Sequence, residues 1–99
     1  MIKLNQDKLL EIKRKTFETL IQQRLDDFAR VRGFDNILSA ASYATSTNAK
    51  FSADGLRCVQ LRDDTWAAMY EILNDVNTGA RPAPGSIDDI EDELPKLVW

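Results

Sequence analysis

The sequence of 99 residues predicts an all-α protein in which two long helices are joined by one short packing helix. Three observations lead to this prediction. Apolar residues recur at helical spacing over both long segments, and no stretch shows the alternating pattern of a strand. Glycine follows each long pattern, at Gly33 and Gly79, and glycine is the residue type that commonly ends helices. A proline-containing linker, a short acidic helix and an extended tail are expected to complete the chain.

The first long helix is predicted over about residues 6–32, with Asn5 as its N-cap and Gly33 as its stop. Its expected core stripe consists of Leu10, Phe17, Ile21 and Phe28, with Leu25 and Val31 beside them. Lys13 and Arg14 project close to the same line, so the early turns are not expected to be buried as fully as the later ones. We expect these early turns to extend past the core.

The two remaining helices of this part are predicted over about residues 36–46 and 53–78. Asp35 is the expected cap of the shorter one, whose serines and alanines are small enough for close backbone approach. Ser52 is expected to open the longer one. Its predicted core face consists of Val59, Trp66 and Leu73, flanked by Leu56, Met69, Tyr70 and Val76.

Two units are expected along the chain: a helical domain over residues 1–79, and a linker, short helix and tail over residues 80–99. Pro82 and Pro84 are incompatible with a helix interior and favour an extended segment. The linker is therefore expected to hold the rest of the chain away from the third helix.

The run "SIDDIEDEL" predicts a short acidic helix after the linker. Ser86 followed by Asp89 resembles a capping box, and the early carboxylates suit the positive end of the helix dipole. Pro95 ends this helix and leaves an apolar tail of Leu97, Val98 and Trp99. Trp99 either folds back onto its own helices or anchors the chain on a partner, and both alternatives stay open. The small core could use the extra burial, but the linker makes the tail separable and favours docking on a partner.

No enzyme activity is predicted, because the chain has no histidine and therefore lacks the usual general base and metal ligand. Its one cysteine, Cys58, has no identifiable base and is expected to be a buried structural thiol in a reducing cytoplasm. The acidic run lacks the loop that wraps calcium. We therefore predict no catalytic residue, cofactor or metal site. No apolar run approaches the length of a membrane span.

Charge is distributed unevenly along the chain. Residues 1–50 carry nine Lys and Arg against six Asp and Glu, whereas residues 51–99 carry four against ten. The basic run Lys13, Arg14 and Lys15 raises the alternative of nucleic-acid binding. Against that alternative, the whole chain is acidic and no binding motif is recognisable. The same basic residues can pair with acids of the second half or of a partner, and we do not expect nucleic acid as the ligand.

Six residues are the candidate partner-binding residues. They are the basic run Lys13, Arg14 and Lys15 on the first helix, and the apolar tail Leu97, Val98 and Trp99. An aromatic residue on an extended segment is a good interface anchor. The long first helix also carries more apolar surface than short neighbours can cover, which indicates self-association or a partner protein.

The segments "RGFDNILSAASYATS", "LRDDTWAAMYEILNDV", "RPAP" and "ELPKLVW" resemble small domains of unknown function encoded in the tail-gene modules of tailed bacteriophages and prophages. The resemblance covers about residues 28–99. It is carried by Arg32, Gly33, Phe34, Ile37, Ser39, Ser42, Tyr43, Arg62, Asp63, Trp66, Tyr70, Pro82, Pro84, Leu94, Pro95 and Trp99. The spacing from Trp66 to Tyr70, followed by a proline segment and a terminal tryptophan, is also similar to tail-fibre assembly proteins, which act as chaperones for fibre folding or attachment.

The resemblance implies a structural or assembly role without known catalytic residues. The expected function is that of a tail-associated structural protein, or a tail or tail-fibre assembly protein, acting through protein–protein contacts. Its expected partners are other tail or fibre proteins, or further copies of the chain. The expected location is the cytoplasm of the bacterial host during assembly, or the tail of the virion. The alternative function is a small phage regulator that binds nucleic acid through the basic first helix.

Overall fold

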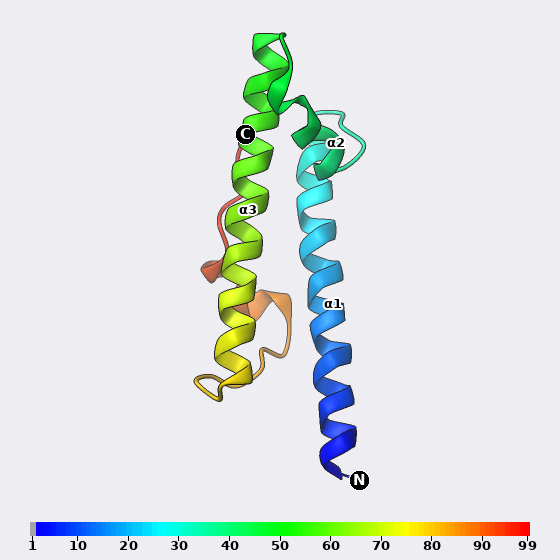
Figure 1. The fold of residues 1–99 in the computed structure, drawn as a ribbon, viewed down its shortest axis with the longest axis vertical. Coiled ribbons are helices and arrows are strands. Elements are labelled where there is room, and N and C mark those ends of the chain that lie inside the picture. Colours follow the sequence, from blue (N-terminus) through cyan, green and yellow to red (C-terminus); the bar gives the residue numbers. More distant parts are fainter. Residues whose placement is uncertain (1) are drawn as a thin grey trace.

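Two long antiparallel helices form the body of the protein (Figure 1). The computed structural model describes the backbone of residues 2–99 and the side chains of residues 13–99. The elements in chain order are α1 (Ile2–Val31), α2 (Ile37–Ala41), the 3-10 turn η1 (Ser42–Thr45), α3 (Ala49–Asn77) and the 3-10 segment η2 (Ile87–Glu93). Residues 2–99 contain no strand. The predicted all-α fold is confirmed.

The core stripe of α1 was largely predictable. Phe17, Ile21, Leu25 and Phe28 are buried, and Ala29 joins them. Val31 is 77% exposed, so its predicted place beside the stripe is wrong. Leu10 lies outside the described side chains. Gly33 follows the helix with a φ of 87°, a left-handed conformation that favours glycine, which confirms the predicted stop.

The predicted N-caps of the first three helices are wrong. Asn5 lies inside α1, which begins at Ile2 because no glycine or proline interrupts the earlier residues. Asn36 caps α2, its side chain accepting a hydrogen bond of 2.8 Å from the Ser39 amide. Asn48 caps α3 and accepts from the two amides at positions 50 and 51, so α3 starts before Ser52. Asparagine satisfies the free amides of a helix start as well as Asp or Ser does.

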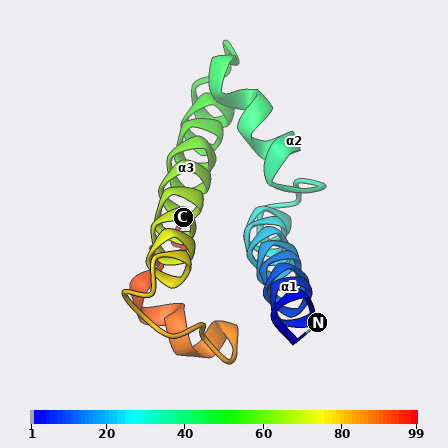
Figure 2. The same ribbon diagram turned by 60° about the horizontal axis from the view of Figure 1, so that its bottom comes forward.

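The connection between the two long helices is not the single helix predicted over residues 36–46. It divides into α2 and η1, which together turn the chain from α1 into α3 (Figure 2). Ala40 and Ala41 are buried, as expected for a packing helix of small residues. At Gly55 of α3, a Cβ atom would lie 2.6 Å from the Tyr43 carbonyl carbon and 2.8 Å from Ala44 Cα. The backbone of η1 therefore packs directly on the backbone of α3.

The buried face of α3 differs from the predicted one. Its buried residues are Gly55, Cys58, Leu61, Thr65, Met69 and Ile72. The predicted line through Val59, Trp66 and Leu73 is only half-buried, and the predicted core residues Leu56 and Tyr70 are 58% and 60% exposed. The true line lies one residue earlier, about 100° around the helix. It begins at Gly55, where the backbone of η1 approaches α3 closely, and it includes the small residues Cys58 and Thr65.

Adjacent substitutions test this assignment of the α3 face. Met69 is 1% exposed, so Met69→Ala is expected to lower the free energy of unfolding by about 2–5 kcal/mol through the lost burial and the cavity left behind. Tyr70→Ala is expected to cost about 1 kcal/mol or less, since it removes mainly an exposed ring that contacts Trp66. Urea denaturation of both variants measures the difference. Equal losses would contradict the observed face.

Residues 80–99 pack against the two long helices instead of standing apart from them (Figure 1). Ile90 and Leu94 are buried in the same cluster as Ile21 and Leu25 of α1. The Asp89 carboxylate accepts hydrogen bonds from the amides before η2, as expected of a capping box, although η2 is a 3-10 segment and not an α-helix. The segment therefore shares its core with the helical domain.

The molecule is elongated, with extents of 56 × 21 × 21 Å. Figure 1 shows the first turns of α1 running past the end of α3, as the sequence predicted. The C-terminal segment covers one face of the helix pair. The basic run Lys13, Arg14 and Lys15 lies toward the end of the helix pair where α1 begins and α3 ends.

Candidate protein-binding site

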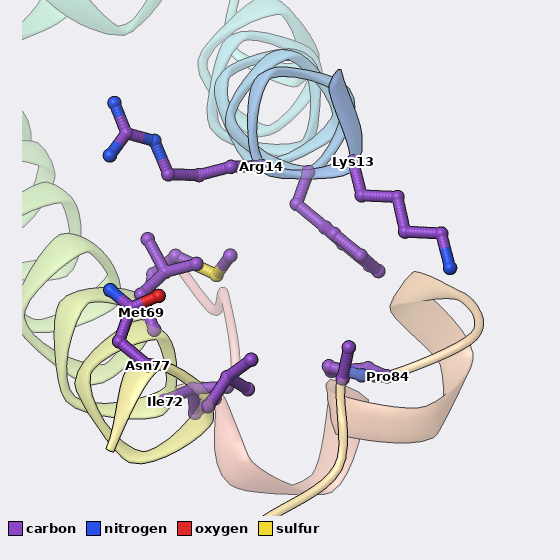
Figure 3. A pocket seen from close by; sticks show the side chains of 10 residues that line it. Lys13, Arg14, Met69, Ile72, Asn77 and Pro84 are labelled. Atoms are coloured by element: carbon purple, nitrogen blue, oxygen red, sulfur yellow. The ribbon is translucent and has the colours of Figure 1, made fainter. Parts of the chain in front are cut away.

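An open pocket lies at the end of the core, between α1, the last turns of α3 and the proline segment (Figure 3). Its volume is about 230 Å³. Its apolar lining consists of Phe17, Met69, Ile72, Leu73, Val76, Ala83 and Pro84. We call it the α1–α3 pocket. Among the described side chains of α1, the turn before Phe17 offers the exposed Lys13 and Arg14 instead of apolar residues, which leaves this space open.

Two cations of α1 border the α1–α3 pocket. Lys13 and Arg14 line it and are exposed. In Figure 3 their side chains leave α1 in opposite directions, Arg14 on the side of α3 and Lys13 on the side of the proline segment. Arg14 forms an exposed ion pair of 3.4 Å with Glu18, one turn along α1. No carboxylate lies among the described residues that line the pocket.

The apolar tail lies at the other end of the core. Trp99 stacks on Phe28 with ring centroids 4.3 Å apart and planes inclined by 12°. Its indole Nε1 donates a hydrogen bond of 3.1 Å to the Phe28 carbonyl, one of the last-turn carbonyls that a helix leaves without a partner. The Arg32 guanidinium lies 4.6 Å from the centre of the Trp99 ring. We call this group of Trp99, Phe28 and Arg32 the C-terminal clasp.

The clasp answers the question that the sequence left open for Trp99. The residue folds back on its own helices and is half-buried, and Leu97 also packs against the core. Val98, between them, is 58% exposed. Extended residues alternate in direction, so a tail lying along the helices buries its first and third residues and exposes the second.

The candidate partner-binding residues therefore do not form one surface. Lys13 and Arg14 border the α1–α3 pocket, and Lys15 is exposed without lining it. The tail contacts α1 about 21 Å farther along the helix axis, since 14 residues separate Arg14 from Phe28. The side of the pocket formed by α3 and the proline segment was not predicted as a site, because Met69 and Val76 follow the apolar pattern of core positions.

Several arginines are paired within the chain, as the charge asymmetry suggested. Arg24 of α1 forms an ion pair of 2.8 Å with Glu91 and donates to the Pro95 carbonyl. Arg32 forms an ion pair of 2.8 Å with Asp54 of α3. These contacts join the basic first half to the acidic second half.

The buried thiol has no partner that would activate it. Cys58 is fully buried in the core cluster. Burial, together with the negative charge of Asp54, raises the pKa of the Cys58 thiol, and Arg32 opposes this shift. The thiol is therefore protonated at neutral pH, and a protonated thiol is a poor nucleophile.

The described part of the chain offers neither a metal site nor a membrane span. Among its side chains, no group of three or more His, Cys, Asp or Glu is placed to hold a metal ion. None of the helices searched is long and apolar enough to span a bilayer. Comparisons with family models, curated proteins and solved structures give no match.

Proposed function

We propose that this protein is a bacteriophage tail-associated structural or assembly protein that acts through protein–protein contacts. The observation that best supports contact with another protein is the α1–α3 pocket, an unfilled apolar continuation of the core at the exposed end of the molecule. The tail setting comes from the resemblance of residues 28–99 to domains of tail-gene modules. Expected partners are other tail or fibre proteins, or further copies of the chain.

The chemistry of the pocket supports adhesion in preference to catalysis. The described residues of its lining are apolar apart from Lys13, Arg14 and Asn77. Its volume of about 230 Å³ is below the ~300–1,000 Å³ typical of small-molecule sites. A cavity of this size suits a side chain of another protein, because a space of ~150 Å³ already holds a benzene ring.

The alternative of nucleic-acid binding has less support. Arg24 and Arg32 are engaged by carboxylates of the same chain. Among the described side chains of α1, the other exposed cations are Lys13, Arg14, Lys15 and Arg30, of which Arg14 pairs with Glu18 and Arg30 pairs with Asp27. A few exposed cations on an acidic protein give weak, strongly salt-dependent binding.

Deletion of the gene from the phage or prophage genome that encodes it tests the proposed function. We expect the deletion to yield filled heads with absent or incomplete tails under the electron microscope, and infectivity to return when the gene is supplied on a plasmid. Location in the host cytoplasm or in the finished tail is decided by immunoblotting purified particles. Normal tails and full infectivity after deletion would contradict the proposal.

A further inference from the structure

The occupant of the α1–α3 pocket can be inferred from the charge and shape of its border. We propose that the pocket receives a large apolar side chain from an acidic amphipathic helix of a partner protein. This inference rests on the proposed function, because it names the chemistry of the partner in that contact. It depends on three features of the described residues: the apolar lining, the two cations that border it and the open path along α1.

The apolar lining requires a large side chain to fill it. Met69 and Ile72 are buried at the base, whereas Leu73 and Val76 of α3 and Pro84 of the linker are only half-buried. Together with Phe17 they surround a space of about 230 Å³. Leucine, methionine or an aromatic residue would remove the remaining apolar surface from water, which is the main favourable term in such contacts.

The cations specify the charge of the occupant. Lys13 and Arg14 border the pocket on two sides, and its described lining contains no carboxylate. The pairing of Arg14 with Glu18 is exposed, with half of the arginine side chain accessible to solvent. Carboxylates flanking the apolar anchor of a partner would lie beside both cations, and such complementarity favours an acidic partner over a basic one.

The path along α1 favours a helical occupant. Beyond the pocket, α1 runs past the last turn of α3, and no other element of residues 2–99 lies beside it there (Figure 1). A partner helix can therefore follow α1 while its anchor enters between α1 and α3. Recognition of an amphipathic helix by an apolar groove is a recurring mode of peptide binding.

Two synthetic amphipathic peptides of equal length test the inference. Both carry the same leucine and tryptophan positions at helical spacing, and glutamate occupies the polar face of one where lysine occupies that of the other. Each is titrated into the isotope-labelled protein at low ionic strength. We expect the acidic peptide to bind about ten-fold more tightly than the basic one, with methyl shifts concentrated on Met69, Ile72, Leu73 and Val76.

Two variants and a matched control sharpen the test. The double substitution Lys13→Glu with Arg14→Glu changes only exposed side chains and should reverse the preference in favour of the basic peptide. Val76→Glu places a carboxylate in the pocket and should weaken acidic-peptide binding at least ten-fold. Leu56→Glu is the control, since Leu56 is exposed on α3 and does not line the pocket. Thermal melting confirms that each variant is folded.

Three results would overturn the inference. They are equal affinity for the two peptides, shifts centred away from the pocket, and no binding of either peptide at millimolar concentration. Sedimentation of the free protein supplies a further outcome: a dimer that Val76→Glu dissociates would show that a second copy fills the pocket. Normal tails after gene deletion would contradict the proposed function but leave peptide recognition intact, so the two failures are distinguishable.

Discussion

Gly55→Val is expected to lower the free energy of unfolding by about 3 kcal/mol or more. Even the first added carbon would lie 2.6 Å from the Tyr43 carbonyl carbon and 2.8 Å from Ala44 Cα. Backbone atoms cannot move aside as a flexible side chain can, so η1 must separate from α3. The helix propensities of valine and glycine differ by only a few tenths of a kcal/mol, which is too little to offset this cost. Total stabilities of small domains are about 5–15 kcal/mol.

Thermal unfolding measures the loss at Gly55. For a domain of this size, about 3 kcal/mol corresponds to a fall in Tm of roughly 12–24 °C. Gly55→Ala should give a smaller loss in the same direction. Gly85→Ala is the matched control, because its added carbon would meet only the Asp89 carboxylate oxygen at 3.3 Å. A Gly55→Val protein that melts like the parent would show that η1 does not pack on α3 in this way.

Trp99→Ala is expected to lower the free energy of unfolding by about 2–4 kcal/mol, or roughly 8–32 °C in Tm. The substitution removes the stacking on Phe28, the indole hydrogen bond to the Phe28 carbonyl and the contact with Arg32. Trp99 is only half-buried, which places the loss below that of a fully buried tryptophan. Trp99→Phe keeps a ring on Phe28 but loses the donor, so its expected cost is about 1 kcal/mol.

The neighbouring position provides the control for Trp99. Val98 is 58% exposed, so Val98→Ala should change the stability by less than about 0.5 kcal/mol. In a Trp66→Phe background, the emission of Trp99 should be blue-shifted and protected from an aqueous quencher in the isolated monomer. If Trp99 emits as a water-exposed tryptophan does, and Trp99→Ala loses no stability, the tail would be free to bind a partner.

The parts of the fold that were predictable from the sequence depend on local rules. The apolar residues of α1 recur with one clear period, and their buried stripe through Ile21 and Phe28 follows from it. Gly33 and Gly79 end their helices because each adopts a positive φ. These features involve residues within a few turns of one another.

The parts that were not predictable depend on contacts between distant residues. The α3 face was assigned through its largest side chains, whereas the buried line includes the small residues Gly55, Cys58 and Thr65, and η1 packs closely at Gly55. One sequence signal was available: a glycine inside a helical pattern costs about 1 kcal/mol relative to alanine, and it commonly has a packing reason. That signal would have placed Gly55 at a contact, although not against η1.

The site was predictable only in part for the same reason. The charged positions Lys13 and Arg14 interrupt the α1 stripe, and the sequence shows this directly. The opposite side of the α1–α3 pocket is formed by α3 and Pro84, whose position depends on how residues 80–99 return to the core. Likewise, whether Trp99 folds back depends on a surface at Phe28 that exists only in the folded chain.

The clasp also has a consequence for the order in which the chain folds. The hydrogen bond from Trp99 to the Phe28 carbonyl joins residues 71 apart, as does the bond from Arg24 to the Pro95 carbonyl. During synthesis, the C-terminal end of α1 therefore leaves the ribosome long before the residue that completes it. Contacts between residues so far apart in sequence carry a larger loop-closure cost than local contacts do, and they are expected to form late. Until they form, the Phe28 ring lacks the cover that Trp99 gives it in the folded protein.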